Sequence, residues 1–270
     1  MRICCFGDLH YYGVRKDLEV LTRNIENTCL ETNVVVIVGD LTSYGSFSHL
    51  EEVLGAVKEV VEPLPILVVP GNHDIYVIPE EVSRGINSLL KLNLFNEMLE
   101  KMDCVALMRR PFIVHDVGFV GSMGWYDYSF APDWLGLRID DFREKSLGLS
   151  IWADREFVKL PFSDEEFTLM LLNRFEEHIK QIYDEVEKVV AVLHHVPFRE
   201  LIHYKLRPEW DYFSTFMGSE SFGYVIRRYG KVKLVLHGHQ HNGVKTRECR
   251  EVEGIKCCNC ASPIPIVVEI

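Results

Sequence analysis

The sequence lacks any long apolar run. No stretch approaches the roughly 20 apolar residues that a membrane-spanning helix needs. At the amino terminus, Asp8 comes too early for the apolar region of a signal peptide. From these two absences we expect a soluble, cytoplasmic protein with no membrane partner.

Positive charge is also scarce. The 270 residues contain 29 lysines and arginines against 40 aspartates and glutamates, which gives a formal net charge of -11. An acidic chain has no long-range attraction for a polyanion such as duplex DNA, so the composition disfavours nucleic acid as a partner. The composition leaves the oligomeric state open.

The eight cysteines lack the spacing of a disulfide framework. Cys4 and Cys5 are adjacent in an apolar segment, so on a strand they would point to opposite faces and could not easily pair with each other. The cluster of Cys257, Cys258 and Cys260 has no second cysteine motif with which to build a thiolate metal site. We therefore expect reduced thiols that act as small core residues.

Repeats, low-complexity tracts and Ser/Gly linkers are absent as well, so residues 1–270 are predicted to form a single domain. In the first third, short apolar runs alternate with polar-periodic segments. The pattern predicts strands at 3–6, 34–38 and 66–69, and helices at 17–31 and 48–61. This β-α-β-α-β order is typical of a parallel sheet that is buried on both faces.

The pattern in the rest of the chain is less regular. Strands are predicted at 105–107, 112–114 and 119–121, whereas residues 124–160 show no clean periodicity and are expected to form an irregular insertion or cap. A long helix is predicted over 163–188, with Ser163 as its N-cap and Glu166 completing a capping box. Two further strands end in "HHVP" and "HGHQH". The tail stretches "GVKTREC", "EGIKCCNC" and "PIVVEI" are expected to close a second sheet as antiparallel strands.

Two groups of side chains each allow two interpretations. Five aromatic residues near the start of the irregular segment either pack in a core, which is the default, or form a wall over a ligand. Five arginines either are solvated at the surface, again the default, or clamp a phosphate. The residues are Trp125, Tyr126, Tyr128, Phe130 and Trp134, and Arg109, Arg110, Arg138, Arg199 and Arg207.

Polar clusters follow the predicted strands: "GDLH", "GDLT", "GNHD", "HHVP" and "HGHQH". Because the carboxyl ends of parallel strands meet at one edge of a sheet, these clusters are expected to converge there. Carboxylates and imidazoles suit divalent or trivalent metals such as Mn, Fe, Zn, Ni or Co, and such a mixture is usual where two metals share a site. The residue types therefore predict a metal site at this edge.

Taken in order, the five blocks resemble the calcineurin-like metallophosphoesterase superfamily, whose pattern is D-x-H, G-D, G-N-H-[DE], H-x-P and G-H-x-H. The resemblance extends from Asp8 to His241. It implies an α/β (α+β) fold, a four-layer sandwich of two mixed β-sheets flanked by helices. It also implies a binuclear-metal-dependent phosphoester hydrolase, either a phosphatase or a phosphodiesterase. Such an enzyme would use a metal-bridging hydroxide as nucleophile on a small or medium-sized substrate.

The resemblance further implies a role for each matching residue. Asp40 would bridge both metals, His73 would stabilise the phosphoryl charge or protonate the leaving oxygen, and Asp74 would orient the imidazole of His73. The H-x-P spacing selects His195 as a ligand, with His194 as the alternative. The first metal would be held by Asp8, His10 and His241, and the second by Asn72, His195 and His239.

Two other functions remain open. A nuclease of the same superfamily would need a basic groove, against which the net charge weighs. Every ligand position of the family pattern is filled in this sequence. A non-catalytic metal-binding scaffold would not require that. A single structural zinc fits poorly, because carboxylates and Asn outnumber what a closed tetrahedral site uses.

Overall fold

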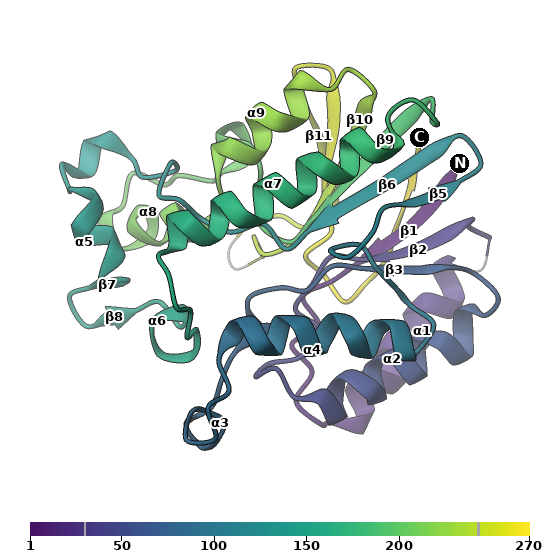
Figure 1. Cartoon of the computed structure of the whole chain (residues 1–270), viewed down its shortest axis with the longest axis horizontal. Coiled ribbons are helices and arrows are strands. Elements are labelled where there is room, and N and C mark those ends of the chain that lie inside the picture. The colour runs from purple at the N-terminus through teal and green to yellow at the C-terminus, as the bar shows by residue number, and fades with distance from the viewer. Residues whose placement is uncertain (30, 242–243) are drawn as a thin grey trace.

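The structure is a computed structural model that describes residues 1–29, 31–241 and 244–270. Two β-sheets pack face to face, and helices cover their outer faces (Figure 1). The expected four-layer sandwich of two mixed sheets flanked by helices is confirmed. Among the described residues, no helix is both long and apolar enough to cross a bilayer.

The first sheet has the strand order β13-β1-β2-β3-β4. Its strands β1 to β4 run parallel to one another, and β13 pairs with β1 in the antiparallel direction. The strands are β1 (Arg2–Phe6), β2 (Val34–Ile37), β3 (Ile66–Val68), β4 (Val105–Ala106) and β13 (Ile266–Glu269).

Three helices cover the outer face of this sheet (Figure 1): α1 (Arg15–Cys29), α2 (Phe47–Val61) and α4 (Ser88–Lys101). Their apolar side chains form one cluster with the outward-facing side chains of the strands. The β-α-β-α-β order of the first third is confirmed, with element ends that differ by one or two residues. The sequence pattern missed α4, and Leu30 in the predicted first helix lies outside the described residues.

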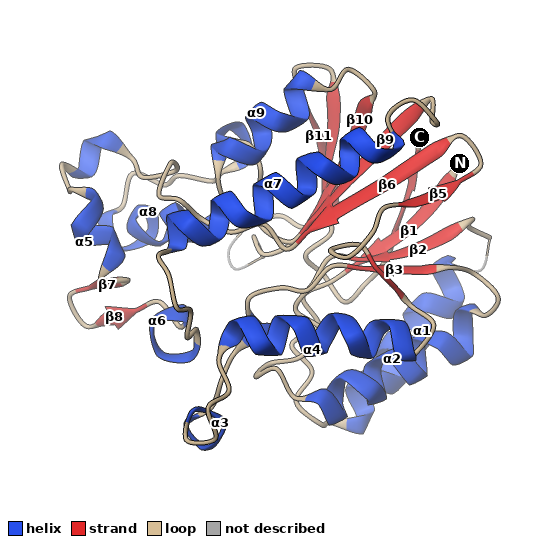
Figure 2. Ribbon diagram, in the orientation of Figure 1, coloured by secondary structure: helices blue, strands red, loops and turns tan. Residues whose placement is uncertain are grey.

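The second sheet has the order β11-β12-β10-β9-β6-β5, and α7 (Asp164–Ile182) and α9 (Glu220–Arg228) lie over its outer face (Figure 2). Strands β12, β10, β9 and β6 are parallel, and the two edge strands are antiparallel to their neighbours. The strands are β5 (Phe112–Val114), β6 (Val117–Ser122), β9 (Lys188–Leu193), β10 (Val232–His237), β11 (Glu248–Val252) and β12 (Ile255–Asn259).

The capping box at the start of α7 is confirmed. Ser163 Oγ accepts a hydrogen bond from the Glu166 backbone N at 3.2 Å, and the Glu166 carboxylate accepts one from the Ser163 N at 2.8 Å. These bonds satisfy two backbone N–H groups that the first turn leaves without helical partners. The helix ends at Ile182, six residues earlier than predicted, because the chain must turn before β9 begins at Lys188.

The expectation for the tail is wrong in part. Strands β11 and β12 are antiparallel as predicted, but β12 joins the second sheet parallel to β10, and β13 pairs with β1 in the first sheet. Val268 of β13 is buried between the sheets. An apolar strand such as β1 needs a partner on its open edge, which β13 supplies. Gly243, at the start of the first tail stretch, lies outside the described residues.

The cysteine expectation is also corrected. Cys4 and Cys5 do face opposite sides of β1, but Cys4 meets Cys29 at the end of α1, and the two form a disulfide with a Cα–Cα distance of 5.3 Å. Cys249 and Cys258 are directly opposed on β11 and β12 and form a second disulfide. The other thiols are free and buried: Cys5, Cys104, Cys257 and Cys260. Within the described part of the chain, no cysteine belongs to a group that could hold a metal.

Residues 124–160 contain only short elements, which lie together beyond the ends of the strands (Figure 1). They are η2 (Asp133–Leu135), α5 (Ile139–Arg143), β7 (Ser146–Leu147), β8 (Ser150–Ile151) and α6 (Asp154–Phe157). The remaining short helices are η1 (His73–Ile75), α3 (Pro79–Val82), η3 (Arg199–Leu201), α8 (Pro208–Ser214) and η4 (Thr215–Met217).

The aromatic residues near the start of this segment pack in the core. Trp125, Tyr126, Tyr128 and Phe130 are buried, and their rings belong to the cluster between α7 and the second sheet. Trp134 is 46% exposed instead. The packing interpretation therefore holds for four of the five residues.

Candidate metal centre

The polar clusters predicted from the sequence meet where the carboxyl ends of the parallel strands of both sheets come together. Asp8 and His10 follow β1, and Asp40 follows β2; His239 and His241 follow β10 on the second sheet. Several of these residues have a left-handed backbone, with φ of 52° at Asp8, 51° at Asp40 and 66° at His239. Such conformations cost about 1–3 kcal/mol each and tend to gather at functional sites.

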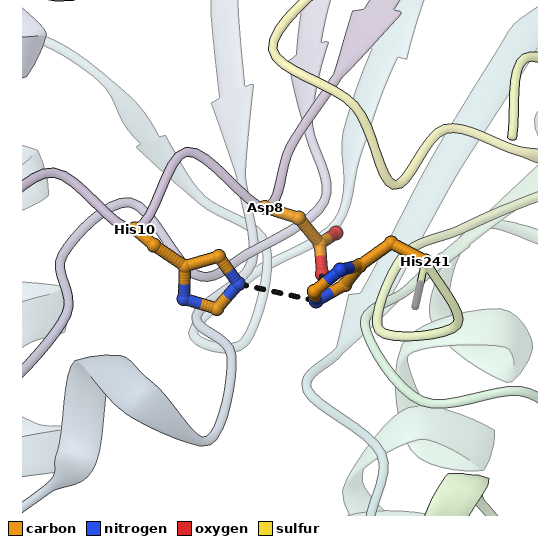
Figure 3. A group of neighbouring side chains, drawn as sticks. All are labelled: Asp8, His10 and His241. Atoms are coloured by element: carbon orange, nitrogen blue, oxygen red, sulfur yellow. Dashed lines mark hydrogen bonds and ion pairs between the residues drawn. The ribbon is translucent and has the colours of Figure 1, made fainter. Parts of the chain in front are cut away.

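One group of donors contains Asp8, His10 and His241 (Figure 3). The Nε2 atoms of His10 and His241 lie 3.3 Å apart, and His241 Nε2 is 3.6 Å from Asp8 Oδ1. The backbone N of His239 donates to both oxygens of Asp8 at 3.1 Å, which fixes the carboxylate in place. The side chains come from both sheets and point toward one another.

A second group contains Asp40, His194 and His239. His194 Nε2 lies 3.4 Å from Asp40 Oδ2, 3.1 Å from Asn72 Oδ1 and 3.1 Å from His239 Nδ1. The other ring nitrogen of His194 bonds to the Val38 carbonyl at 2.8 Å. The Val38 carbonyl can only accept, so Nδ1 of His194 donates the proton and Nε2 faces the cluster.

Asp40 lies between these two groups and also belongs to a third group, with His10 and His73. Its Oδ2 is 3.4 Å from His194 Nε2 and 3.7 Å from His10 Nε2. The side chain is 1% exposed, so its oxygens are not shared with bulk water. Gly71 packs against it so closely that a Cβ at this position would come within 2.1 Å of Asp40 Oδ1. The glycine of "GNHD" is therefore required by the position of the carboxylate.

Both histidines of "HHVP" lie at the cluster: His194 Nε2 faces Asp40, Asn72 and His239, and the His195 ring centre lies 4.3 Å from that of His239. His195 Nδ1 bonds to the Met123 carbonyl at 2.9 Å, and its ring packs 5.1 Å from that of Trp125. The H-x-P spacing selected His195, but the residue at the end of β9 that points across to the first sheet is His194. His195 Nε2 is buried and, like His239 Nε2, has no hydrogen-bond partner among the described residues, so the two histidines are alternative donors for the same cation.

A buried carboxylate, that of Asp154, orients the side-chain amide of Asn72. Its Nδ2 donates to Asp154 Oδ1 at 2.8 Å and to the Tyr76 hydroxyl at 3.1 Å, which leaves Oδ1 facing His194. Asp154 also accepts from the Tyr76 and Tyr126 hydroxyls and from Trp152 Nε1. No motif marks Asp154, because it lies in the irregular segment, and sequence reasoning missed it.

The role expected for Asp74 needs correction. Its carboxylate accepts hydrogen bonds from the backbone N of Leu41, Thr42 and Gly71, and among the described residues no hydrogen bond joins it to the His73 ring. Asp74 therefore ties the loop after β2 to the loop after β3. The His73 imidazole is oriented instead by the Ser43 carbonyl, which lies 2.9 Å from Nδ1.

Burial and neighbouring charges shift the acidity of this cluster. Burial raises the pKa of Asp8 to about 8. Burial would also raise the pKa of Asp40, but His194 and His73 hold it well below its usual range. For His194 burial acts to lower the pKa, yet the adjacent Asp40 carboxylate raises it to about 9. Burial lowers the pKa of His10 to about 4.

The arrangement fits bound cations. Two buried carboxylates share a pocket with imidazoles whose nitrogens face one another, and His239 Nε2 is buried with no hydrogen-bond partner among the described residues. Buried charges and buried polar atoms need compensation from a partner or a metal. Oxygen and imidazole donors at this density are typical of sites that bind two transition-metal ions.

The cluster lies in the wall of a cavity of about 1000 Å³. The wall also contains His73 and residues of the 124–160 segment and of α8. No lysine or arginine of the described chain lines it, so none of the five candidate arginines is a phosphate clamp there. Arg109 and Arg199, for example, pair with Glu100 and Glu220.

Comparison with known proteins gives a family and a fold. A sequence model described as calcineurin-like phosphoesterase matches residues 1–243. No curated protein sequence matches the chain. Among solved structures, the phosphopantetheinyl hydrolase of Mycobacterium tuberculosis is similar, with a TM-score of 0.75 and 17% identity over 97% of this chain and 89% of that one.

Two more distant structures have the same fold. A purple acid phosphatase from yellow lupin seeds has a TM-score of 0.53 and 12% identity, over 100% of this chain and 46% of that one. The protein described as the anchor in the inner membrane complex of Plasmodium has a TM-score of 0.50 and 13% identity, over 97% of this chain and 72% of that one. At these identities the likeness concerns the fold alone.

Proposed function

The chain belongs to the calcineurin-like phosphoesterase family and is a metal-dependent phosphoester hydrolase, and from that premise we propose that it works with two cations held side by side. The observation that carries the proposal is the place of Asp40, whose Oδ2 lies within 3.7 Å of His10 Nε2 and within 3.4 Å of His194 Nε2. A carboxylate between two groups of imidazoles suits two metals better than one.

The proposed ligands follow from the two groups of donors. Asp40 is shared by both cations, and Gly71 leaves room for its carboxylate. His194 takes the place that the motif spacing gave to His195, because its Nε2 faces Asn72 and His239. The first cation is assigned to Asp8, His10, Asp40 and His241, and the second to Asp40, Asn72, His194 and His239.

When bound, two such cations would acidify a shared water and neutralise the oxygens of the phosphate. Beside the two cations, His73 is the side chain proposed to act on the substrate. Its Nδ1 donates to the Ser43 carbonyl, so Nε2 is the ring nitrogen left for the substrate in the cavity. From there it binds a phosphoryl oxygen or gives a proton to the leaving oxygen.

The substrate is proposed to be a small or medium-sized phosphoester, cleaved by a phosphatase or phosphodiesterase reaction. A nuclease is disfavoured, because the net charge is -11 and the described cavity wall carries no lysine or arginine for a polynucleotide backbone. The chain is taken as one domain in which residues 124–160 cover the site. The cytoplasm stays the predicted location, against which the two disulfides weigh, because disulfides are rare in reducing compartments.

A scaffold without activity is the remaining candidate, since the Plasmodium anchor protein has this fold. A scaffold would not need Asp40 between two sets of imidazoles, nor Asn72 held by Asp154 with its amide oxygen toward them. These features favour the enzyme.

The test compares Asp40→Asn with His73→Asn in the full chain. We expect Asp40→Asn to lose bound metal and activity, because it removes the shared charge. We expect His73→Asn to keep its metal but to lower kcat by roughly 10²- to 10⁴-fold, the usual effect of losing a general acid. Metal content is measured by mass spectrometry, and turnover with p-nitrophenyl phosphate and bis-p-nitrophenyl phosphate in the presence of Mn²⁺.

The exposed His115, in the turn between β5 and β6, provides a control as His115→Asn. It should match the unchanged protein in metal content and rate. Equal metal loss in Asp40→Asn and His73→Asn would contradict the separate roles, and no turnover of either substrate with any of Mn, Fe, Zn, Ni or Co would favour the scaffold.

A further inference from the structure

Beyond the metal centre, one wall of the cavity is formed by aromatic side chains. Trp152 begins this wall directly beside the proposed ligand His239, with the two ring centres 5.8 Å apart and the rings nearly perpendicular. Phe213 of α8 stacks on Trp152 with a centre distance of 6.0 Å and an angle of 25°. Trp210 and Met217 also line the cavity. A substituent that leaves the metal centre on this side meets flat apolar surface.

The loops of the first sheet add aromatic residues to the same cavity. Tyr12 and Tyr44 line it and are 62% and 52% exposed. Tyr76 lies next to the proposed acid His73, with ring centres 4.4 Å apart. Aromatic rings from both halves of the chain therefore contact the space where the substituents of a phosphate would lie.

Among the described residues, no lysine or arginine lines the cavity. Glu209 of α8 is the one Asp, Glu, Lys or Arg outside the metal cluster among the described residues of the wall. Lys205 is near in sequence, but its ammonium rests 3.1 Å from the centre of the Trp210 ring and does not line the cavity. A second phosphate or a carboxylate on the substrate would meet no lysine or arginine here, only hydroxyl groups and the imidazole of His203, and would be repelled by Glu209.

We propose that the substrate is a phosphoester whose leaving group is uncharged and flat, and that Trp152, Trp210 and Phe213 bind this group beside the metal centre. The inference rests on the proposed function and adds the chemical class of the substrate. Esters that carry further phosphates or carboxylates are disfavoured by Glu209.

Four phosphomonoesters test this with the metal-loaded full chain, by release of inorganic phosphate: phenyl phosphate, 4-carboxyphenyl phosphate, 1-naphthyl phosphate and ethyl phosphate. Phenyl phosphate and 4-carboxyphenyl phosphate have leaving groups of similar basicity but differ by one negative charge. We expect kcat/KM for the carboxylated ester to be lower by about two- to five-fold, as repulsion from one exposed charge about 4 Å away in water predicts. We expect KM for 1-naphthyl phosphate to lie below that for phenyl phosphate.

Variants then locate the effect. Trp210→Leu should raise KM for 1-naphthyl phosphate by roughly 3- to 10-fold, the value of one aromatic contact, and leave ethyl phosphate unaffected. Glu209→Lys should reduce the difference in kcat/KM between phenyl phosphate and its carboxylated analogue. The matched control is Trp134→Leu, which removes an exposed tryptophan outside the cavity. It should leave KM for 1-naphthyl phosphate unchanged, and also the ratio of kcat/KM between phenyl phosphate and its carboxylated analogue.

The outcomes separate the two proposals. Two results would overturn this inference but not the proposed hydrolase. One is hydrolysis of all four esters with kcat/KM for the carboxylated ester equal to or above that for phenyl phosphate. The other is a KM for 1-naphthyl phosphate that Trp210→Leu leaves unchanged. Absence of hydrolysis of every ester with each of the metals would overturn the proposed function, and this inference with it.

Discussion

His194 and His195 are neighbours in the chain, but their rings face different surroundings. The Nε2 of His194 lies among Asp40, Asn72 and His239, whereas His195 bonds to the Met123 carbonyl and packs on Trp125. Both are buried, and burial together with the charge of His194 lowers the pKa of His195 to about 3. His195 Nε2 has no hydrogen-bond partner among the described residues, and its ring centre lies 4.3 Å from that of His239, so the metal content of variants distinguishes the two histidines.

The pair gives a prediction at the scale of single residues. His194→Gln should lower the metal content from two cations per chain to about one, because its nitrogen is a proposed ligand of the second cation only. His195→Gln should keep both, although it removes a packed ring and lowers stability. Mass spectrometry of metals on both purified variants checks this, and loss of a cation from His195→Gln alone would reverse the assignment.

The residue types of the site could be predicted from the sequence, but some orientations could not. Asp8, His10 and Asp40 follow apolar runs at spacings that only a strand followed by a loop explains. The partner of Asp74 could not be read, because a carboxylate beside a histidine in sequence can turn toward backbone N–H groups instead. Asp154 gave no signal at all, since Asn72, the residue that it orients, lies 82 residues away.

At the scale of elements, the short helix α6 connects the irregular segment to the metal centre. Asp154 at its first position accepts hydrogen bonds from Asn72, Tyr76, Tyr126 and Trp152 while being 1% exposed. Four donors around one carboxylate leave it little freedom to rotate. Asn72 therefore has only one amide orientation that keeps Nδ2 bonded, and that orientation aims its oxygen at the proposed second cation.

Asp154→Asn should thus weaken the binding of the second cation by roughly 10- to 100-fold, the usual range for a residue that orients a ligand. Titration of the metal-free protein with Mn²⁺ measures this. The control is Asp164→Asn on α7, because Asp164 also binds aromatic donors, Trp125 and Tyr128, but does not contact the site. It should lower stability and leave the dissociation constants unchanged; equal weakening in both variants would contradict a positioning role for Asp154.

Elements with strong local signals were predictable, and those defined by distant pairing were not. The capping box at Ser163 fixes the start of α7 from four adjacent residues. The partner of β13 depends instead on the open edge of β1, more than 260 residues away along the chain. The aromatic wall of the cavity likewise joins Trp152 with Trp210, which no local pattern connects.

At the scale of the whole molecule, the metal centre joins the two sheets. Asp8, Asp40 and Asn72 come from loops of the first sheet, and His194, His239 and His241 from loops of the second. Without a cation, these loops bring together buried carboxylates, and burial already raises the pKa of Asp8 to about 8. The contact between the two sheets is therefore least favourable at this edge when no metal is bound.

Removal of metal should lower the stability of the whole fold. A ligand present at about 100 times its dissociation constant stabilises a folded protein by about 2.7 kcal/mol. For a chain of this size that corresponds to a fall in Tm of roughly 5–10 °C on treatment with a chelator. Differential scanning calorimetry with and without chelator measures the shift. The Asp40→Asn variant should show almost none, and a Tm independent of metal in the unchanged protein would count against two buried cations.

The pairing of β13 with β1 has a practical consequence. The Met1 amine donates to the Ile270 carbonyl at 3.0 Å, and the Ile270 N donates to the Met1 carbonyl at 3.1 Å, so both ends lie where β1 begins (Figure 1). The metal centre lies where β1 ends. A fluorescent reporter, an affinity handle or a solid support attached at either end is therefore directed away from the cavity mouth. A short peptide could also link both ends into a circularly permuted enzyme without crossing the path of the substrate.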